Sequence, residues 1–108
     1  MRVTDFTIYS GAAVVLSTTS TVIDMQHALG VSVQMVWTST TASFAVTLQV
    51  SNDRTTYIDT AQTQAIVDNN GSVMLTLVDN MNKYVRANIV RTSGTLTTLT
   101  LKAIAKGV

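Results

Sequence analysis

The sequence predicts an all-β protein, built as a single β-sandwich of about eight or nine antiparallel strands over residues 1–108. Three observations lead to this expectation. Apolar and polar residues alternate in several stretches, which is the period of a strand with one buried face. Turn-forming residues separate these stretches at intervals of roughly 8–12 residues. The polar positions are filled mainly by Thr and Ser, and β-branched Thr fits a pleated surface.

Alternation is clearest in the stretch that begins at Val31, where Val33, Met35 and Trp37 share one face of the expected strand. The same pattern defines five strands, at 31–37, 44–50, 72–77, 85–89 and 98–103. Weaker patterns add strands at 5–10, 12–16 and 21–25, and one or two more within 56–66. Gly, Asn, Asp and Ser place turns at 10–11, 29–30, 51–54, 68–71, 79–82 and 93–94.

Composition excludes several classes of protein. The chain has no Cys, so it forms neither disulfides nor thiolate metal sites. Its net charge is +1 and its basic residues are scattered, which argues against nucleic acid as a partner. No stretch approaches the roughly 20 apolar residues that span a membrane, and residues 1–5 do not resemble an export signal. We therefore expect no nucleic-acid and no membrane partner.

The sequence contains no motif that predicts catalysis or metal binding. His27 is the single histidine, and no nucleophile motif or second histidine accompanies it. All six acids are Asp, and most stand beside Asn, Gly or Thr in expected turns. The segment 68–71 lacks the spacing and terminal Glu of an EF-hand calcium loop. The sequence thus predicts no catalytic, cofactor-binding or metal-binding residue, and a protein that is not an enzyme.

Aromatic and basic residues are the best candidates for contacts with a partner. Trp37, Phe6 and Phe44 share the inward phase of their apolar neighbours, so we expect them in the core. The three tyrosines have the opposite phase or follow a turn, so we expect them to be exposed, where a ring with a polar tip suits an interface. With three arginines they form the predicted interface set: Tyr9, Arg54, Tyr57, Tyr84, Arg86 and Arg91.

Two segments resemble the discoidin-like and galactose-binding-like jelly rolls. In 48–57, Ser51-Asn52-Asp53 is followed by Tyr57, which is similar to a hairpin of that group. The strand 84–89 and the hairpin 93–96 resemble its late strand and return hairpin. The resemblance implies a sandwich of the jelly-roll type. The Cys pair, acidic calcium loop and aromatic loop spikes of that group are missing here, so the resemblance covers the scaffold only.

The short, Thr-rich, sparsely charged chain without Cys or Pro also resembles the capsid decoration (cement) proteins of tailed bacteriophages. This resemblance implies a virion protein made in the host cytoplasm and placed on the outer capsid surface. There it would bind and stabilise adjacent subunits of the major capsid protein and form a homo-oligomer. The alternative is a carbohydrate-binding module on a virion or tail, with Tyr57 and Trp37 as stacking rings. No cofactor is expected in either case.

Overall fold

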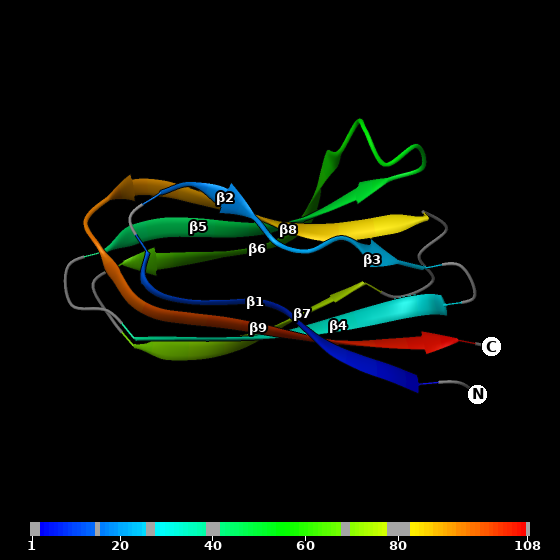
Figure 1. The fold of residues 1–108 in the computed structure, drawn as a ribbon, viewed down its shortest axis with the longest axis horizontal. Helices are drawn as coiled ribbons and strands as arrows, with labels where there is room; N and C mark the ends of the chain where they lie inside the picture. Colours follow the sequence, from blue (N-terminus) through cyan, green and yellow to red (C-terminus); the bar gives the residue numbers. More distant parts are fainter. Residues whose placement is uncertain are drawn as a thin grey trace.

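A computed structural model describes residues 3–14, 16–25, 28–38, 42–67, 70–77 and 83–107. These residues form two antiparallel sheets packed face to face, without a helix (Figure 1). The strands are β1 (Val3–Val14), β2 (Thr18–Thr19), β3 (Ile23–Asp24), β4 (Ala28–Thr38), β5 (Ser43–Ser51), β6 (Ile58–Val67), β7 (Gly71–Leu77), β8 (Tyr84–Ser93) and β9 (Leu96–Gly107). The all-β sandwich is confirmed.

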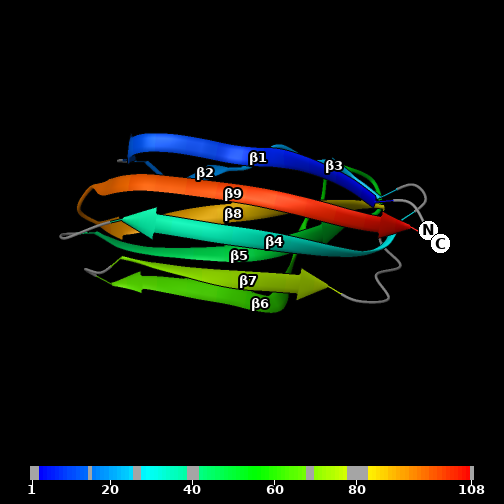
Figure 2. The same cartoon turned by 90° about the horizontal axis from the view of Figure 1, so that it is seen from below.

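Strand order identifies the sandwich as a jelly roll. One sheet has the order β1-β9-β4-β7, which Figure 2 shows from outside, and the other has the order β2-β8-β5-β6. The short strands β2 and β3 both pair with β8, opposite its later and earlier residues, so they act as one interrupted edge strand. Each sheet then holds four strand positions, and the chain crosses between the sheets at every connection except the β5–β6 hairpin, as in two Greek keys.

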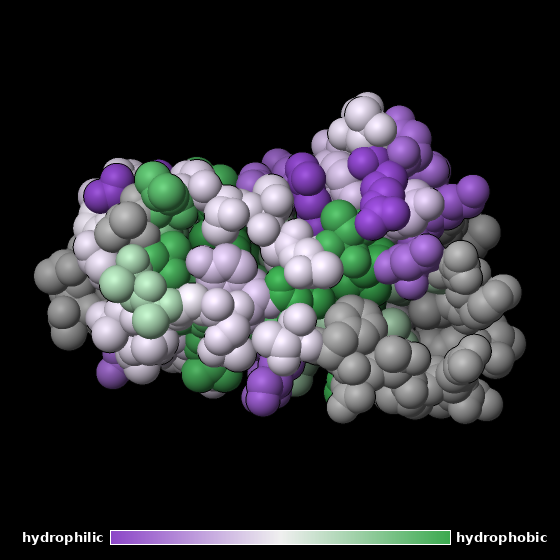
Figure 3. Space-filling view, in the orientation of Figure 1, coloured by the Kyte–Doolittle hydropathy of each residue, from purple (hydrophilic) through white to green (hydrophobic). Residues whose placement is uncertain are grey.

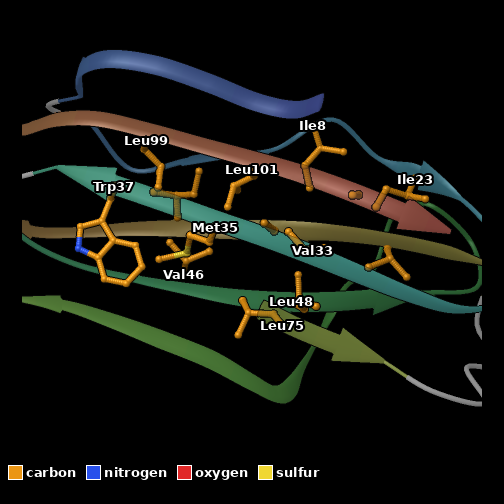
Figure 4. Packing of buried hydrophobic residues seen from close by; sticks show 14 of the residues in the cluster. Ile8, Ile23, Val33, Met35, Trp37, Val46, Leu48, Leu75, Leu99 and Leu101 are labelled. Atoms are coloured by element: carbon orange, nitrogen blue, oxygen red, sulfur yellow. The ribbon is translucent and has the colours of Figure 1, made fainter. Parts of the chain in front are cut away.

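The core lies between the two sheets and is lined by alternate residues of each strand (Figure 4). From β4, the side chains of Val33, Met35 and Trp37 point inward and are buried. Phe44 is buried as well, so the inward phase predicted for these positions is confirmed. The Phe6 side chain lies outside the described part of the structure.

Trp37 is accommodated by the residue directly opposite it on β7, which is Gly71. A Cβ atom at Gly71 would lie 2.6 Å from Cζ2 of Trp37, well inside van der Waals contact. Glycine is therefore required here because the indole occupies the space of a side chain.

Several boundaries differ from the sequence prediction. The expected turn at 10–11 and the expected separate strands at 5–10 and 12–16 are wrong, because β1 runs unbroken along β9 as far as Val14. The expected turn at 29–30 is also wrong: this segment lies in β4, beside a bulge. Leu16 lies beyond β1 and is 71% exposed. The turn at 93–94 is confirmed, with Gly94 at a φ of 74°.

Hydrogen bonds connect the sheets along both flanks of the sandwich. On one flank the Thr76 N–H of β7 donates to Oε1 of Gln62 in β6, at 3.1 Å. On the other, the Thr21 N–H donates to the carbonyl of Ile8 in β1, at 2.9 Å. These bonds use backbone groups that would otherwise be open at sheet edges.

Candidate partner-binding site

The loop between β5 and β6 projects from the body of the sandwich and is held by its own side chains (Figure 1). Oγ of Ser51 accepts hydrogen bonds from the backbone N–H groups of Asp53 and Arg54, at 3.2 and 3.0 Å. Oδ1 of Asp53 accepts from the N–H groups of Thr55 and Thr56, both at 2.8 Å. The predicted turn at 51–54 is thus confirmed, and its polar side chains fix its shape.

These bonds also set the charge of the loop. The backbone N–H of Thr56, then that of Thr55, and the Ser51 hydroxyl lower the pKa of Asp53 to about 2. Donors of this kind stabilise the ionised carboxylate. Arg54 adopts a φ of 63°, in the left-handed region that non-glycine residues seldom occupy. The network around Asp53 holds Arg54 in this conformation.

Two arginines meet two tyrosines beside this loop. The Cζ atom of Arg86 lies 3.7 Å from the centroid of the Tyr57 ring, and that of Arg54 lies 5.6 Å from the centroid of the Tyr84 ring. Tyr84 and Arg86 are two residues apart on β8, so they share its outer face. We call these four residues, Arg54, Tyr57, Tyr84 and Arg86, the arginine–tyrosine corner.

A polar chain orients Arg86 within the corner. Its Nε donates to Oε1 of Gln49 at 2.9 Å, and Nε2 of Gln49 donates to Oδ1 of Asp59 at 2.8 Å. Gln49 is only 9% exposed and stands opposite both residues in the strand registers. The guanidinium is thus fixed along one edge by Gln49 and on one face by Tyr57.

The tyrosines are more enclosed than the sequence predicts, since Tyr9, Tyr57 and Tyr84 are all half-buried rather than exposed. The hydroxyl of Tyr57 is buried and has no hydrogen-bond partner among the described residues. The Tyr9 ring lies over Gly11 and packs against the core. Arginines distant in the sequence cover the rings of Tyr57 and Tyr84. Tyr9 follows a bulge in β1, which changes the direction of its side chain.

The structure brings together four of the six predicted interface residues and separates the other two. Tyr9 belongs to β1 of the other sheet. Arg91 stands near the far end of β8, where its Nε donates to the carbonyl of Gly94 at 2.8 Å. Sequence reasoning missed Gln49 and Asp59, whose only signal was their position near the predicted hairpin.

Hydrophilic side chains gather around the projecting β5–β6 loop (Figure 3), and several of the side chains in this region are charged. Those with described side chains in this part of the second sheet are Asp24, Asp53, Arg54, Asp59, Lys83 and Arg86. The remaining described charges, Arg91 and Lys102, lie elsewhere. The corner is polar but close to neutral, with as many acids as bases.

The outer face of the first sheet has a different character. We call it the β4–β9 face; its outward residues are Ser32, Gln34, Val36 and Thr38 of β4, Thr98, Thr100, Lys102 and Ile104 of β9, and Ser72, Met74 and Thr76 of β7. Thr38 and Thr98 share a hydroxyl hydrogen bond of 2.7 Å. A shallow hollow of about 410 Å³ crosses this face beside Gln34, Met74 and Lys102. Among the side chains that the structure describes on this face, Lys102 is the single charged one and none is aromatic.

The described residues contain no group of three or more His, Asp or Glu side chains that could hold a metal ion. His27, Asp68 and Asp79 lie outside the described residues, and so does Asn69, whereas Asn70 and Gly71 of the segment 68–71 are described. In the part of the chain that the structure describes, no helix is long and apolar enough to cross a membrane.

No protein-family model and no curated protein sequence matches the chain. Solved structures share its fold at low identity. The SPBc2 prophage-derived protein YomS is 14% identical, with 96% of this chain and 92% of that chain covered and a TM-score of 0.68. The PBSX exported protein XepA is 12% identical, with 97% and 37% covered and a TM-score of 0.69.

A third similar structure is that of Bacillus endospore appendages, described as disulfide-linked pili, at 12% identity and a TM-score of 0.62, with 98% of this chain and 88% of that chain covered. The present chain has no Cys, so it cannot form such links. These likenesses show that the fold of this chain also occurs in a prophage-derived protein, in an exported protein and in endospore appendages.

Proposed function

We propose that the protein is a structural component of a bacteriophage virion, a decoration (cement) protein on the outer capsid surface. It binds and stabilises adjacent subunits of the major capsid protein, and it self-associates about a symmetry axis of the particle. The observation that carries this proposal is the β4–β9 face, a broad sheet surface whose described side chains are hydroxyl, amide and aliphatic groups with the single charge of Lys102. Such a surface suits burial against another protein more than free exposure.

Fold likeness to YomS and XepA supports a phage origin. A cement protein acts through many copies, so a modest contact per copy is effective when each copy touches more than one neighbour. Shells carrying the protein are favoured over separated subunits by the binding free energy of each copy.

Three findings count against the carbohydrate-binding alternative, which depended on the rings of Trp37 and Tyr57. Trp37 is 4% exposed and belongs to the core, so it cannot stack on a sugar. The ring of Tyr57 has the Arg86 guanidinium 3.7 Å from its centroid, which occupies one of its faces. The hollow of the β4–β9 face has no aromatic lining among the described residues.

The proposal is tested by the rupture temperature of capsids stripped of the protein and then re-decorated. We expect re-decorated shells to rupture at a higher temperature. We also expect attachment to weaken only modestly between about 0.1 and 1 M salt, since the contact is mainly uncharged. Identical rupture temperatures with and without the protein would contradict the cement function, and complete release by salt would contradict a packed contact.

A matched pair of variants locates the attachment surface. Val36 on the β4–β9 face and Val90 on the outer face of the second sheet are each 43% exposed. We expect Val36→Glu to weaken attachment at least about tenfold, because it places an unpaired charge in the contact. Val90→Glu, with the same chemical change, should attach normally. Equal behaviour of the two variants would mean that the β4–β9 face is not the attachment surface.

A further inference from the structure

We propose that the arginine–tyrosine corner is a second binding site, which takes the carboxylate side chains of an acidic segment on a partner protein. Arg86 is its principal contact and Arg54 its second. The identification of that partner as a capsid subunit rests on the proposed function, but the carboxylate chemistry does not.

Arg86 is already arranged to receive a carboxylate. Its ring contact with Tyr57 fixes the plane of the guanidinium, and its Nε bond to Gln49 fixes the rotation within that plane. Its two terminal nitrogens make no hydrogen bond to any described residue. A planar guanidinium binds a carboxylate through two parallel N–H···O bonds, and a fixed orientation reduces the entropy lost on binding.

Asp53 and Asp59 are engaged with donors other than the arginines of the corner. Asp53 accepts hydrogen bonds from backbone N–H groups and from the Ser51 hydroxyl, and Asp59 accepts from the amide of Gln49. No ion pair joins either acid to Arg54 or Arg86 among the described residues. The corner therefore holds two oriented cations, while Asp53 and Asp59 are engaged with uncharged donors.

Arg54 adds a second contact beside the first. Its backbone is held in the left-handed region by the Ser51 and Asp53 network, and its guanidinium lies over Tyr84. Tyr84 and Arg86 occupy neighbouring positions on the outer face of β8, about 7 Å apart for alternate residues of a strand. An extended segment has alternate side chains at this spacing, so it can place one acidic side chain beside Arg86 and another beside Tyr84, over which Arg54 lies.

A protein surface fits the corner better than a nucleic acid does. Asp24, Asp53 and Asp59 bring as much negative charge as Arg54, Lys83 and Arg86 bring positive charge. A nucleic acid needs a continuous basic stripe, which is missing here. Directed bonds to single carboxylates, flanked by tyrosine rings, are typical of protein interfaces. Since this site and the β4–β9 face belong to opposite sheets, one copy can contact two neighbours at once.

The site is tested by titrating the full chain with a capped hexaglutamate peptide and following the Nε–H signals of its arginines by NMR. We expect the signals of Arg54 and Arg86 to shift, and that of Arg91 to remain in place. Arg86→Gln should weaken the peptide affinity about tenfold and Arg54→Gln about threefold. Lys102→Gln, which removes the same charge from the other sheet, should change the affinity less than twofold.

Two further arms make the result decisive. Arg86→Lys keeps the charge and removes the planar fork, so it should also weaken binding several-fold; an unchanged affinity would overturn the assignment. Equal shifts with hexaglutamine or with inorganic phosphate would overturn it as well, because the site would not then be specific for carboxylates. Melting curves verify that each variant is folded. If Arg86→Gln does not fold, Arg86→Lys alone tests the role of Arg86 in peptide binding.

Attachment to stripped capsids is measured in parallel with the peptide titration. Attachment without peptide binding would overturn the carboxylate site and leave the proposed function intact. Peptide binding without attachment to any capsid would overturn the proposed function and leave the carboxylate-binding site intact.

Discussion

Trp37 and Tyr57 are two aromatic rings at opposite ends of the sandwich that are covered in different ways. Trp37 faces the core, and the bare backbone of Gly71 lies against it. Tyr57 precedes β6, and its cover is a side chain, that of Arg86. A ring enclosed by backbone cannot be replaced or crowded without a rearrangement of strands, whereas a ring enclosed by a side chain can adjust. The first ring should therefore contribute mainly to stability and the second mainly to binding.

The largest effect is expected from Trp37→Ala. Removing a buried large aromatic costs about 3–5 kcal/mol, a large part of the roughly 5–15 kcal/mol that stabilises a domain of this size. Urea unfolding measures the loss. Tyr57→Ala should cost less than half as much, because its ring is only half-buried and solvent-facing groups can close over it. Equal losses for both would remove the distinction between the two rings.

Gly71→Ala tests whether the β7 backbone and the Trp37 ring can move apart to admit a methyl group. The added methyl would lie 2.6 Å from the Trp37 ring, so either the strand or the indole must move, at a cost of about 1–3 kcal/mol in unfolding free energy. Gly11→Ala is the matched control: its methyl would meet the Tyr9 hydroxyl at 2.8 Å, the far end of a side chain that can swing away. If Gly11→Ala lowers the unfolding free energy more than Gly71→Ala does, cover by backbone does not decide how much stability such a substitution costs.

The sequence predicted the core ring because strand alternation is a local property. Trp37 continues the phase of Val33 and Met35, and each of them is buried. Strand ends were predicted less well for the same reason: Gly11 and Gly30 were expected in turns, but pairing with β9 extends through both segments. Long-range pairing overrides local turn preference, and a single sequence does not reveal it.

The binding site was predicted only in part. Tyr84 and Arg86 were identified from their outward phase on one strand, and Arg54 and Tyr57 from their place near a turn. That these four meet depends on the pairing of β5 with both β6 and β8, which places Gln49 between its neighbours. Residue type and phase predicted outward positions, but not which of them are adjacent or how far each ring is covered.

A smaller effect, of opposite sign, is expected from Tyr57→Phe. The Tyr57 hydroxyl is buried without a partner among the described residues, and such a group costs stability. Removing it while keeping the ring should leave the unfolding free energy unchanged or raise it by about 1 kcal/mol, and should leave hexaglutamate binding unaltered. A clear loss of stability would mean that the hydroxyl has a partner in the native protein.

The smallest effect is a change of stability at low pH, and it arises in the β5–β6 loop of the corner and not in the core. The pKa of Asp53 is lowered from 3.8 to about 2 in the folded chain, chiefly by the backbone N–H groups of Thr56 and Thr55. A lowered pKa means that the folded state binds a proton less readily than the unfolded state. The contribution of Asp53 is therefore fully present above about pH 4 and disappears as the pH falls towards 2. Asp53→Asn cannot titrate, so its melting temperature should lie below that of the wild type at neutral pH, and the gap should narrow between pH 4 and pH 2. A gap that stays constant down to pH 2 would show that the Asp53 carboxylate is not held by these donors, and the oriented position proposed for Arg54 would lose its support.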